Sequence, residues 1–255
     1  MARLYKYGRA KDTDNRQAVI FDDPDFDAKG AVKKAKEKDE ELSLIPGTGR
    51  AGIVKSLFKM RFNPLPGTKA EAQSIKRILK DKAIIKEYKN DQATETNLLK
   101  VKRPNILHIA THGFFINDNT IPNPMLKSGI ALSGANTSAI HGRSDGIVTA
   151  LKLSGLELKG TDLVVLSACQ TGVVDINSTD SVSGLSKAFI QAGAKDIVMS
   201  LWSVNDQATK KLMESFYKQM QTQANYATAL KQAKLEMIRQ DMHPFYWGGF
   251  ILNGI

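Results

Sequence analysis

Two residues that could act together as a covalent catalyst follow two apolar segments of the sequence. Cys169, the only cysteine among 255 residues, comes directly after LVVLSA (residues 163–168), and His112 follows NILHIA (residues 105–110) and one threonine. If both segments are parallel strands, their carboxyl ends meet at one edge of a sheet, which is where open α/β sheets bind ligands. A thiolate is a nucleophile and an imidazole is a base, so this pair predicts nucleophilic catalysis.

Each of these residues also has a purely structural interpretation. A lone cysteine is usually a small buried hydrophobe, and a lone histidine is usually a hydrogen-bonded structural group. The position of Cys169 favours chemistry, because a structural cysteine would fit better among the preceding valines than just before the break at Gly172. Gly113 follows His112 and has no side chain, so its backbone N–H could approach a substrate carbonyl closely.

A metal site is a second interpretation of the histidines. His108 and His112 have the spacing of a helical zinc pair, but Ile109 stands where a metalloprotease helix carries glutamate. On a strand the two histidines would lie about 13 Å apart, too far to share a metal. We therefore interpret His108 as a strand residue and expect neither a metal nor a cofactor.

The elements around these residues alternate between two periodicities. Short runs rich in valine and isoleucine predict strands, and apolar residues three or four apart predict helices. Such an alternation is typical of an α/β protein with a mostly parallel sheet covered on both faces. The expected strands are residues 18–21, 83–88, 105–110, 163–168 and 197–202, and the expected helices are residues 69–80, 182–191, 207–220 and 226–240.

Composition limits the class of protein. With 42% hydrophobic and 24% charged residues, the chain can bury the core of one large domain or two small ones. A single cysteine forms no internal disulfide, and no apolar run approaches the roughly 18 residues of a membrane span. The charged N-terminus lacks the apolar segment of a secretory signal. We expect a soluble protein of the reducing cytoplasm, without membrane association.

The positive charge is concentrated in the N-terminal portion. Residues 1–104 hold 24 Lys and Arg against 15 Asp and Glu, whereas the remaining residues hold 12 against 11. The densest cluster, KGAVKKAKEKDEE (residues 29–41), alternates in sign, as a solvated helix face or loop does. Aromatic residues are not interleaved with it, so we expect no specific nucleic-acid binding.

A dinucleotide-binding motif is the remaining alternative. GTGRAG (residues 47–52) matches G-x-G-x-x-G, but Pro46 precedes its first glycine and two prolines interrupt the following helix. Glu87 comes 35 residues after Gly52, where an acidic residue is expected after about 20. We interpret this segment as a loop.

Several longer blocks carry a family resemblance. They resemble, in order, the blocks of the CHAT domain, a caspase-like cysteine peptidase domain often attached to tetratricopeptide repeats. The resemblance implies a caspase-like (caspase-hemoglobinase) three-layer fold, with a mostly parallel central sheet flanked by helices. The blocks are LPGTKAEAQSI (65–75), HIATHGFF (108–115), DLVVLSACQTG (162–172), GLSKAFIQAGAKDIVMSLWSVND (184–206) and HPFYWGGFILNG (243–254).

The resemblance assigns the catalytic residues. His112 matches the family's catalytic histidine and Cys169 matches its nucleophile. The backbone N–H groups of Gly113 and Cys169 would then bind the oxyanion, as in caspase-like enzymes generally. Cys169 would end its strand because the thiolate has to project from the sheet edge toward a substrate carbonyl.

The same resemblance assigns substrate contacts. The SLWSVND block resembles the segment that pairs with an extended substrate, which would place Trp202 and Ser203 beside it. Asp206 either faces the residue before the cut or caps the helix that starts after it, and we favour capping. Ser167 stands where arginine-specific relatives such as metacaspases carry an acid. We therefore expect a medium apolar residue such as Leu or Met before the scissile bond, with Arg or Lys as the rival that uses Asp206.

The chain departs from the family pattern in two places. Thr179, Asp180 and Ser181 replace a frequent Gly-Glu-Gly, so any role of that glutamate falls on the shorter Asp180. The strand and helix usual upstream in the family are missing, which suggests either a piece of a longer protein or a module that works with a separate partner. We expect one CHAT domain over residues 1–255, with a basic, loop-rich portion at 1–64 and the core at 65–255.

Two functions agree with this sequence. The first is a cysteine endopeptidase that cuts one or a few protein substrates when a partner or a tetratricopeptide repeat sensing domain activates it. The second is a catalytically silent caspase-like interaction module. The presence of both His112 and Cys169 favours the peptidase, because a module that only binds has no need of the dyad.

Overall fold

The computed structural model describes residues 16–29, 60–116, 121, 123–140, 146–170 and 179–254, without the side chains of 138–140, 168–170 and 179–183. The glycine motif at 47–52 and all of the charged run after Lys29 lie outside the described residues. The expectations about these segments therefore stay predictions.

The described residues form one eight-stranded sheet in the order β2-β1-β3-β6-β7-β8, with β4 and β5 attached beside β3. The pairs β2-β1, β1-β3, β3-β6 and β6-β7 are parallel. The pairs β3-β4, β4-β5 and β7-β8 are antiparallel. The strands are β1 (Gln17–Pro24), β2 (Ile84–Asn90), β3 (Ile106–Phe115), β4 (Ser128–Ala131), β5 (Ile147–Thr149), β6 (Leu163–Gln170), β7 (Asp196–Ser200) and β8 (Phe250–Gly254). The expectation of a mostly parallel α/β sheet is confirmed.

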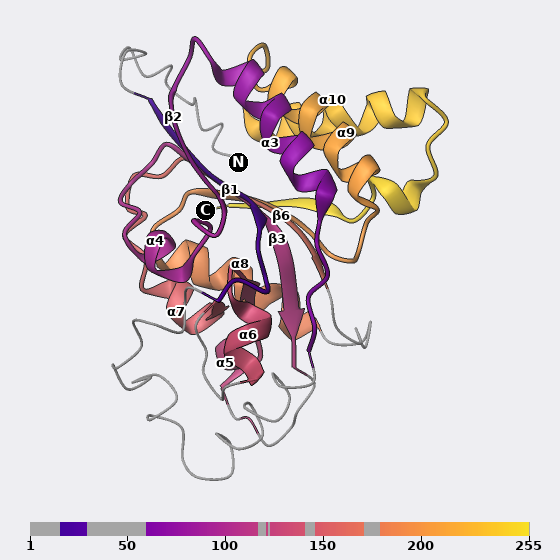
Figure 1. Cartoon of the computed structure of the whole chain (residues 1–255). Helices are drawn as coiled ribbons and strands as arrows, with labels where there is room; N and C mark the ends of the chain where they lie inside the picture. The colour runs from indigo at the N-terminus through magenta and orange to yellow at the C-terminus, as the bar shows by residue number, and fades with distance from the viewer. Residues whose placement is uncertain are drawn as a thin grey trace.

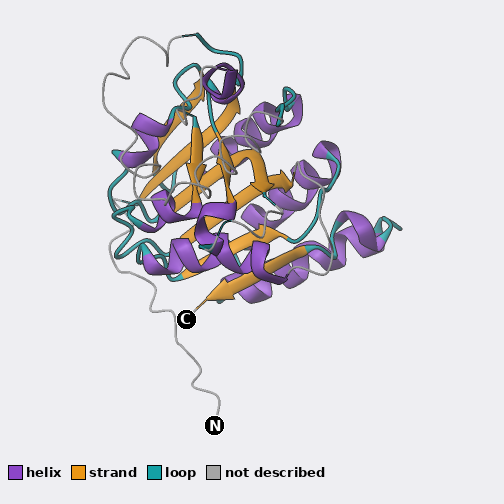
Figure 2. Ribbon diagram, turned by 90° about the horizontal axis from the view of Figure 1, so that it is seen from below, coloured by secondary structure: helices purple, strands orange, loops and turns teal. Residues whose placement is uncertain are grey.

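Helices cover both faces of this sheet (Figure 1). On one face lie α3 (Pro66–Leu79), α9 (Asp206–Gln219) and α10 (Tyr226–Arg239). The other face carries α4 (Glu95–Leu99), α7 (Ala150–Ser154) and α8 (Thr179–Gln191), with α5 (Pro124–Lys127) and α6 (Ala135–Ile140) near its end. Figure 2 shows the same layers from below, with the strands between the two groups of helices.

The central strands are buried because they are apolar on both faces. Residues of β1 alternate between two cores: Val19 and Phe21 pack on the α7–α8 side, and Ala18 and Ile20 pack on the α3–α9 side. This double burial is typical of parallel strands covered by helices on each face. None of the described helices is long and apolar enough to cross a membrane.

Three short strands were not expected from the sequence. The strands β4, β5 and β8 have four, three and five residues, too few for an alternating pattern to stand out. Of these, β4 changes the surroundings of the site. The first half of β3 pairs with β1, whereas its second half, which contains His112, pairs with β4. As a result β3 extends to Phe115, and His112 and Gly113 lie within the strand rather than after its end.

The expected cap of α9 is wrong by one residue. Asn205, not Asp206, is the N-cap, and its side chain accepts a hydrogen bond from the backbone N–H of Gln207. Asparagine and aspartate are both good N-caps, and here the earlier of the two neighbours takes the cap position. Asp206 is thus the first helical residue, which leaves its carboxylate for other partners.

A buried carboxyl lies near the end of β1. Asp22 is 1% exposed, and burial, then Glu87, then Asp23, raise its pKa from 3.8 to about 7. The unfolded chain therefore loses this proton at lower pH than the folded chain does. Stability should fall as the pH rises from about 4 to about 7, and level off above that range.

Substituting Asp22→Asn should remove this part of the pH dependence. Three pKa units correspond to at most about 4 kcal/mol of unfolding free energy between pH 4 and pH 7.5. Denaturant unfolding at a series of pH values measures it. The exposed Asp81→Asn serves as control and should keep the wild-type slope. An Asp22→Asn slope equal to wild type would contradict the assignment.

Candidate active site

The pairing of β3 with β6 brings the two candidate catalytic residues together. His112 of β3 is the register partner of Cys169 of β6, and the pairs on either side, from Ile106 with Leu163 to Gly113 with Gln170, run without a shift. Neighbouring strands lie about 4.8 Å apart, so a base and a nucleophile on register partners are within reach of one another. The side chain of Cys169 is outside the described residues.

The ring of His112 is held by a backbone carbonyl. Its Nε2 atom lies 2.7 Å from the carbonyl oxygen of Asn63, in the segment that precedes α3. A carbonyl oxygen only accepts, so Nε2 carries the proton and donates it. In the neutral imidazole the basic lone pair is then on Nδ1, which fixes the tautomer with which this histidine could act as a base.

Two aromatic rings enclose this imidazole. The ring centroids of Phe26 and Phe62 lie 5.2 Å and 5.8 Å from that of His112, and the histidine is 4% exposed. Both phenylalanines belong to a third buried cluster with Phe114 of β3. Such walls limit the ring's rotation and keep water away from one side of it.

Gly113 lies between two strands. It pairs with Ile130 of β4 on one side and with Gln170 of β6 on the other. The backbone positions assigned to the oxyanion, Gly113 and Cys169, are thus near neighbours on adjacent strands. Their role stays a prediction.

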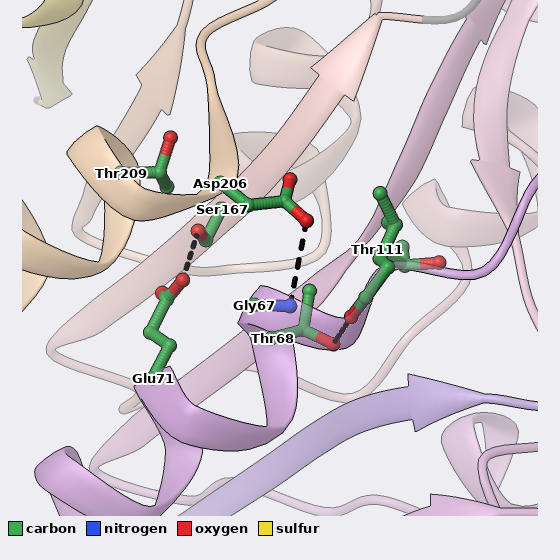
Figure 3. A pocket seen from close by; sticks show the side chains of 8 residues that line it. Gly67, Thr68, Glu71, Thr111, Ser167, Asp206 and Thr209 are labelled. Carbon is green, nitrogen blue, oxygen red and sulfur yellow. Dashed lines mark hydrogen bonds between the residues drawn. The ribbon is translucent and has the colours of Figure 1, made fainter.

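Two of the expected substrate-binding residues share a small cavity. Ser167 of β6 and Asp206 of α9 both line it (Figure 3), together with hydroxyl groups from three threonines. Its volume is about 10 Å³, room for about one water molecule. The full lining is Leu65, Gly67, Thr68, Glu71, Thr111, Ser167, Asp206 and Thr209.

Asp206 interacts with the start of another helix. Its Oδ2 accepts from the backbone N–H of Gly67 at 3.4 Å, across from α9 to the first turn of α3. The residue before that helix, Leu65, has no side chain able to cap it. A carboxylate is favourable at a helix N-terminus, so Asp206 acts there as a cap supplied by a distant segment.

A buried polar network, not predicted from the sequence, extends from the cavity lining into the core. Glu71 of α3 is 2% exposed; its Oε2 accepts from Ser167 Oγ at 3.0 Å, and its Oε1 lies 3.1 Å from His108 Nε2. His108 Nδ1 lies 3.1 Å from the hydroxyl of Tyr217 on α9. Burial, and then Glu71, raise the pKa of Tyr217 well above its usual value, so the hydroxyl keeps its proton and can donate to Nδ1.

A sequence signal for this network did exist. Glu71 lies on the same helical stripe as Ile75 and Ile78, four and seven residues later, and a charge in an apolar stripe needs a buried partner. His108 likewise interrupts an apolar strand. The interpretation of His108 as a strand residue is confirmed.

Trp202 lies away from the cavity. Its Nε1 donates to the carbonyl of Phe245 at 2.9 Å, and the two rings stack with centroids 6.0 Å apart. A Cβ on Gly249 would come within 2.7 Å of the indole, so glycine is needed there. The segment after β7 turns toward the C-terminal block, so Trp202 is not among the described residues that line the cavity with Ser167. Its place beside the substrate stays a prediction.

The structure gives the backbone position of the two remaining expected substrate-binding residues. Ser203 is exposed, two residues before the N-cap of α9. Asp180 lies in the first turn of α8, and its side chain is outside the described residues. Neither Ser203 nor Asp180 is among the described residues that line the cavity.

The chain is similar to known proteins. The family model of the CHAT domain matches residues 2–255. Tetratricopeptide repeat protein 28 of Homo sapiens is 24% identical over 217 residues, which cover 76% of this chain and 8% of that protein. The protein of the same name from Mus musculus is 24% identical over 218 residues, or 76% of this chain and 9% of its own length. The chain thus spans less than a tenth of these curated relatives.

Removing the carboxylate of the buried network should destabilise the fold strongly. Glu71→Ala leaves His108 and Ser167 without their partner, at a cost of about 3–5 kcal/mol of unfolding free energy. Glu71→Gln keeps an acceptor for Ser167 and should lose less. Denaturant unfolding measures both values.

The exposed pair between Glu157 and Arg103 provides a matched control. Glu157→Ala should barely change the unfolding midpoint, because exposed ion pairs contribute little. Equal losses in Glu71→Ala and Glu157→Ala would show that the buried network does not stabilise the sheet.

Proposed function

Because the chain belongs to the CHAT domain family, which is caspase-like and peptidase-related, we propose that it is a cysteine endopeptidase with His112 and Cys169 as its dyad. The observation that supports this most directly is the register pairing of these two residues on β3 and β6. A module that only binds other proteins would need neither a histidine at position 112 nor a cysteine at position 169.

The reaction follows from the tautomer of His112. Nδ1 removes the proton of the Cys169 thiol, and the thiolate sulfur attacks the carbonyl carbon of the scissile peptide. The carbonyl oxygen becomes an oxyanion, which the backbone N–H groups of Gly113 and Cys169 bind. When the C–N bond breaks, His112 gives its proton to the leaving amine, and the acyl group stays on sulfur as a thioester.

The second half of the reaction restores the enzyme. Nδ1 of His112 takes a proton from water, and the resulting hydroxide attacks the thioester carbonyl. The C–S bond breaks, the carboxylic acid product leaves, and the sulfur recovers its proton. The hydrogen bond from Nε2 to Asn63 persists throughout and stabilises the ring in both of its charge states.

The residue before the cut is proposed to be apolar and of medium size, such as Leu or Met. An entering Arg or Lys recovers its lost hydration only from a free carboxylate. Both carboxylates near Ser167 are engaged: Glu71 with Ser167 and His108, and Asp206 with the first turn of α3. Trp202 and Ser203 are proposed to contact the extended substrate at residues other than the one before the cut.

Partners are proposed from the names of the relatives. The relatives are tetratricopeptide repeat proteins by name, and most of their length lies outside the match with this chain. We propose that a tetratricopeptide repeat segment, in the same chain or in a partner, activates cleavage of one or a few protein substrates in the cytoplasm. The basic portion at 1–64 is proposed to belong to the CHAT domain, with residues 65–255 as its core.

Loss of either member of the dyad should abolish cleavage. Cys169→Ala and His112→Ala should each reduce proteolysis of a protein substrate to background in the presence of the activating partner. Cys169→Ala removes one small atom and should change the unfolding free energy by less than about 1.5 kcal/mol. Cleavage retained in Cys169→Ala would end the proposal. A wild-type protein that cleaves nothing, and whose thiol titrates at an ordinary pKa, would support the silent interaction module instead.

A peptide library cleaved by the activated enzyme tests the preferred residue. Cutting after Leu or Met should predominate and should be unchanged in Asp206→Asn, which keeps an acceptor for Gly67. Strict cutting after Arg or Lys that disappears in Asp206→Asn would instead assign Asp206 as the specificity residue.

A further inference from the structure

Asn136, in the first turn of α6, holds both backbone polar groups of one distant residue, Phe62. Its Oδ1 accepts from the backbone N–H of Phe62 at 2.9 Å, and its Nδ2 donates to the carbonyl of Phe62 at 3.0 Å. Asn136 is 4% exposed, so these bonds are protected from water. A carboxamide both donates and accepts in one plane, which suits it to clamp an extended backbone.

The same residue holds a second segment. The backbone N–H of Asn136 donates to the carbonyl of Phe26 at 2.9 Å, and its Nδ2 lies 3.2 Å from Asp27 Oδ1. Phe26 and Phe62 are the two rings that enclose His112. The side-chain amide of Asn136 thus holds the Phe62 wall and contacts Asp27 next to the Phe26 wall, and its backbone N–H holds Phe26 itself, although the two walls come from segments far apart in the sequence.

The clamp also reaches the hydrogen bond of the histidine. Asn63, whose carbonyl accepts from His112 Nε2, is bonded directly to the clamped Phe62. Because the Phe62 backbone is held at its N–H and its carbonyl, the directions in which the Asn63 carbonyl can point are limited. Asn136 hydrogen-bonds to the Phe62 backbone, to the Phe26 carbonyl and to Asp27, so its effect on the histidine passes through these two segments.

We infer that Asn136 is a positioning residue: it holds the Asn63 carbonyl and the two phenylalanine rings that fix the orientation and tautomer of His112. The inference rests on the proposed function, in which His112 is the base of Cys169. It requires an amide at position 136. An ionised aspartate there could accept from Phe62 N–H, but would face the carbonyl of Phe62 and the carboxylate of Asp27 without a proton to donate.

The single cysteine makes the test specific. Iodoacetamide alkylation reports on Cys169 alone, because the chain has no other thiol. A well-placed imidazole lowers the pKa of a thiol below its ordinary value of about 8.5, so the wild-type thiol should react rapidly at neutral pH. Asn136→Ala should shift the pH profile toward about 8.5 and lower the rate at pH 7 by roughly tenfold. Asn136→Asp should shift the pH profile and the alkylation rate in the same direction. It serves as the test variant if Asn136→Ala does not fold.

Thr137→Ala is the matched control. The Thr137 hydroxyl donates to the carbonyl of Asp27 at 3.1 Å, so it holds the same segment without contacting Phe62. This variant should keep the wild-type alkylation profile. A shift in Thr137→Ala equal to that in Asn136→Ala would mean that general loosening, and not the clamp on Phe62, controls the thiol.

A second measurement separates this inference from the proposed function. In protein labelled with nitrogen-15 at histidine, the Nε2–H of His112 should give a slowly exchanging NMR signal, lost in Asn136→Ala and kept in Thr137→Ala. If the wild-type protein and His112→Ala alkylate identically, the dyad is wrong, and the NMR signal still decides whether Asn136 holds the ring. A folded Asn136→Ala with the wild-type signal and pH profile overturns the inference.

Discussion

The arrangement of the central strands depends on one buried carboxylate. Glu71 reaches from α3 across the sheet face and contacts Ser167 of β6 and His108 of β3, which in turn contacts Tyr217 of α9. Burying a polar or charged group is costly unless partners lie close to it, so these contacts form only when both strands and both helices are in place. His112 and Cys169 lie a few residues farther along β3 and β6, so the contacts of Glu71 join the two strands that carry the candidate dyad.

Around the histidine, positioning is done mostly by the backbone. A carbonyl holds the ring nitrogen, two aromatic rings limit the rotation of the imidazole, and a buried asparagine holds the segments that carry these rings through its side chain and its backbone N–H. In a triad a carboxylate side chain orients the base. A neutral carbonyl in its place stabilises the imidazolium less, which suits a thiol, because a thiol loses its proton more readily than a serine hydroxyl does.

Periodicity and residue type predicted the parallel sheet, the four long helices and the proximity of His112 to Cys169. These follow from local patterns and from the rule that parallel strands end at a common edge. What could not be predicted depends on partners distant in the sequence. Asp206 was expected to cap its own helix and instead contacts the start of α3. The contact of Trp202 with Phe245 likewise joins two distant segments, and β4 is too short for its pattern to be visible.

The pairing of β3 with β6 also has a consequence for the life of the chain before it is folded. These strands are far apart in the sequence, and each parallel contact between them requires the closure of a long loop before it gives any stabilisation. The thiol and its base therefore meet only after most of the sheet has assembled. A newly synthesised chain carries both groups of the candidate dyad, yet they stay apart until β6 has paired with β3, so the peptidase proposed above would be inactive toward neighbouring chains until then.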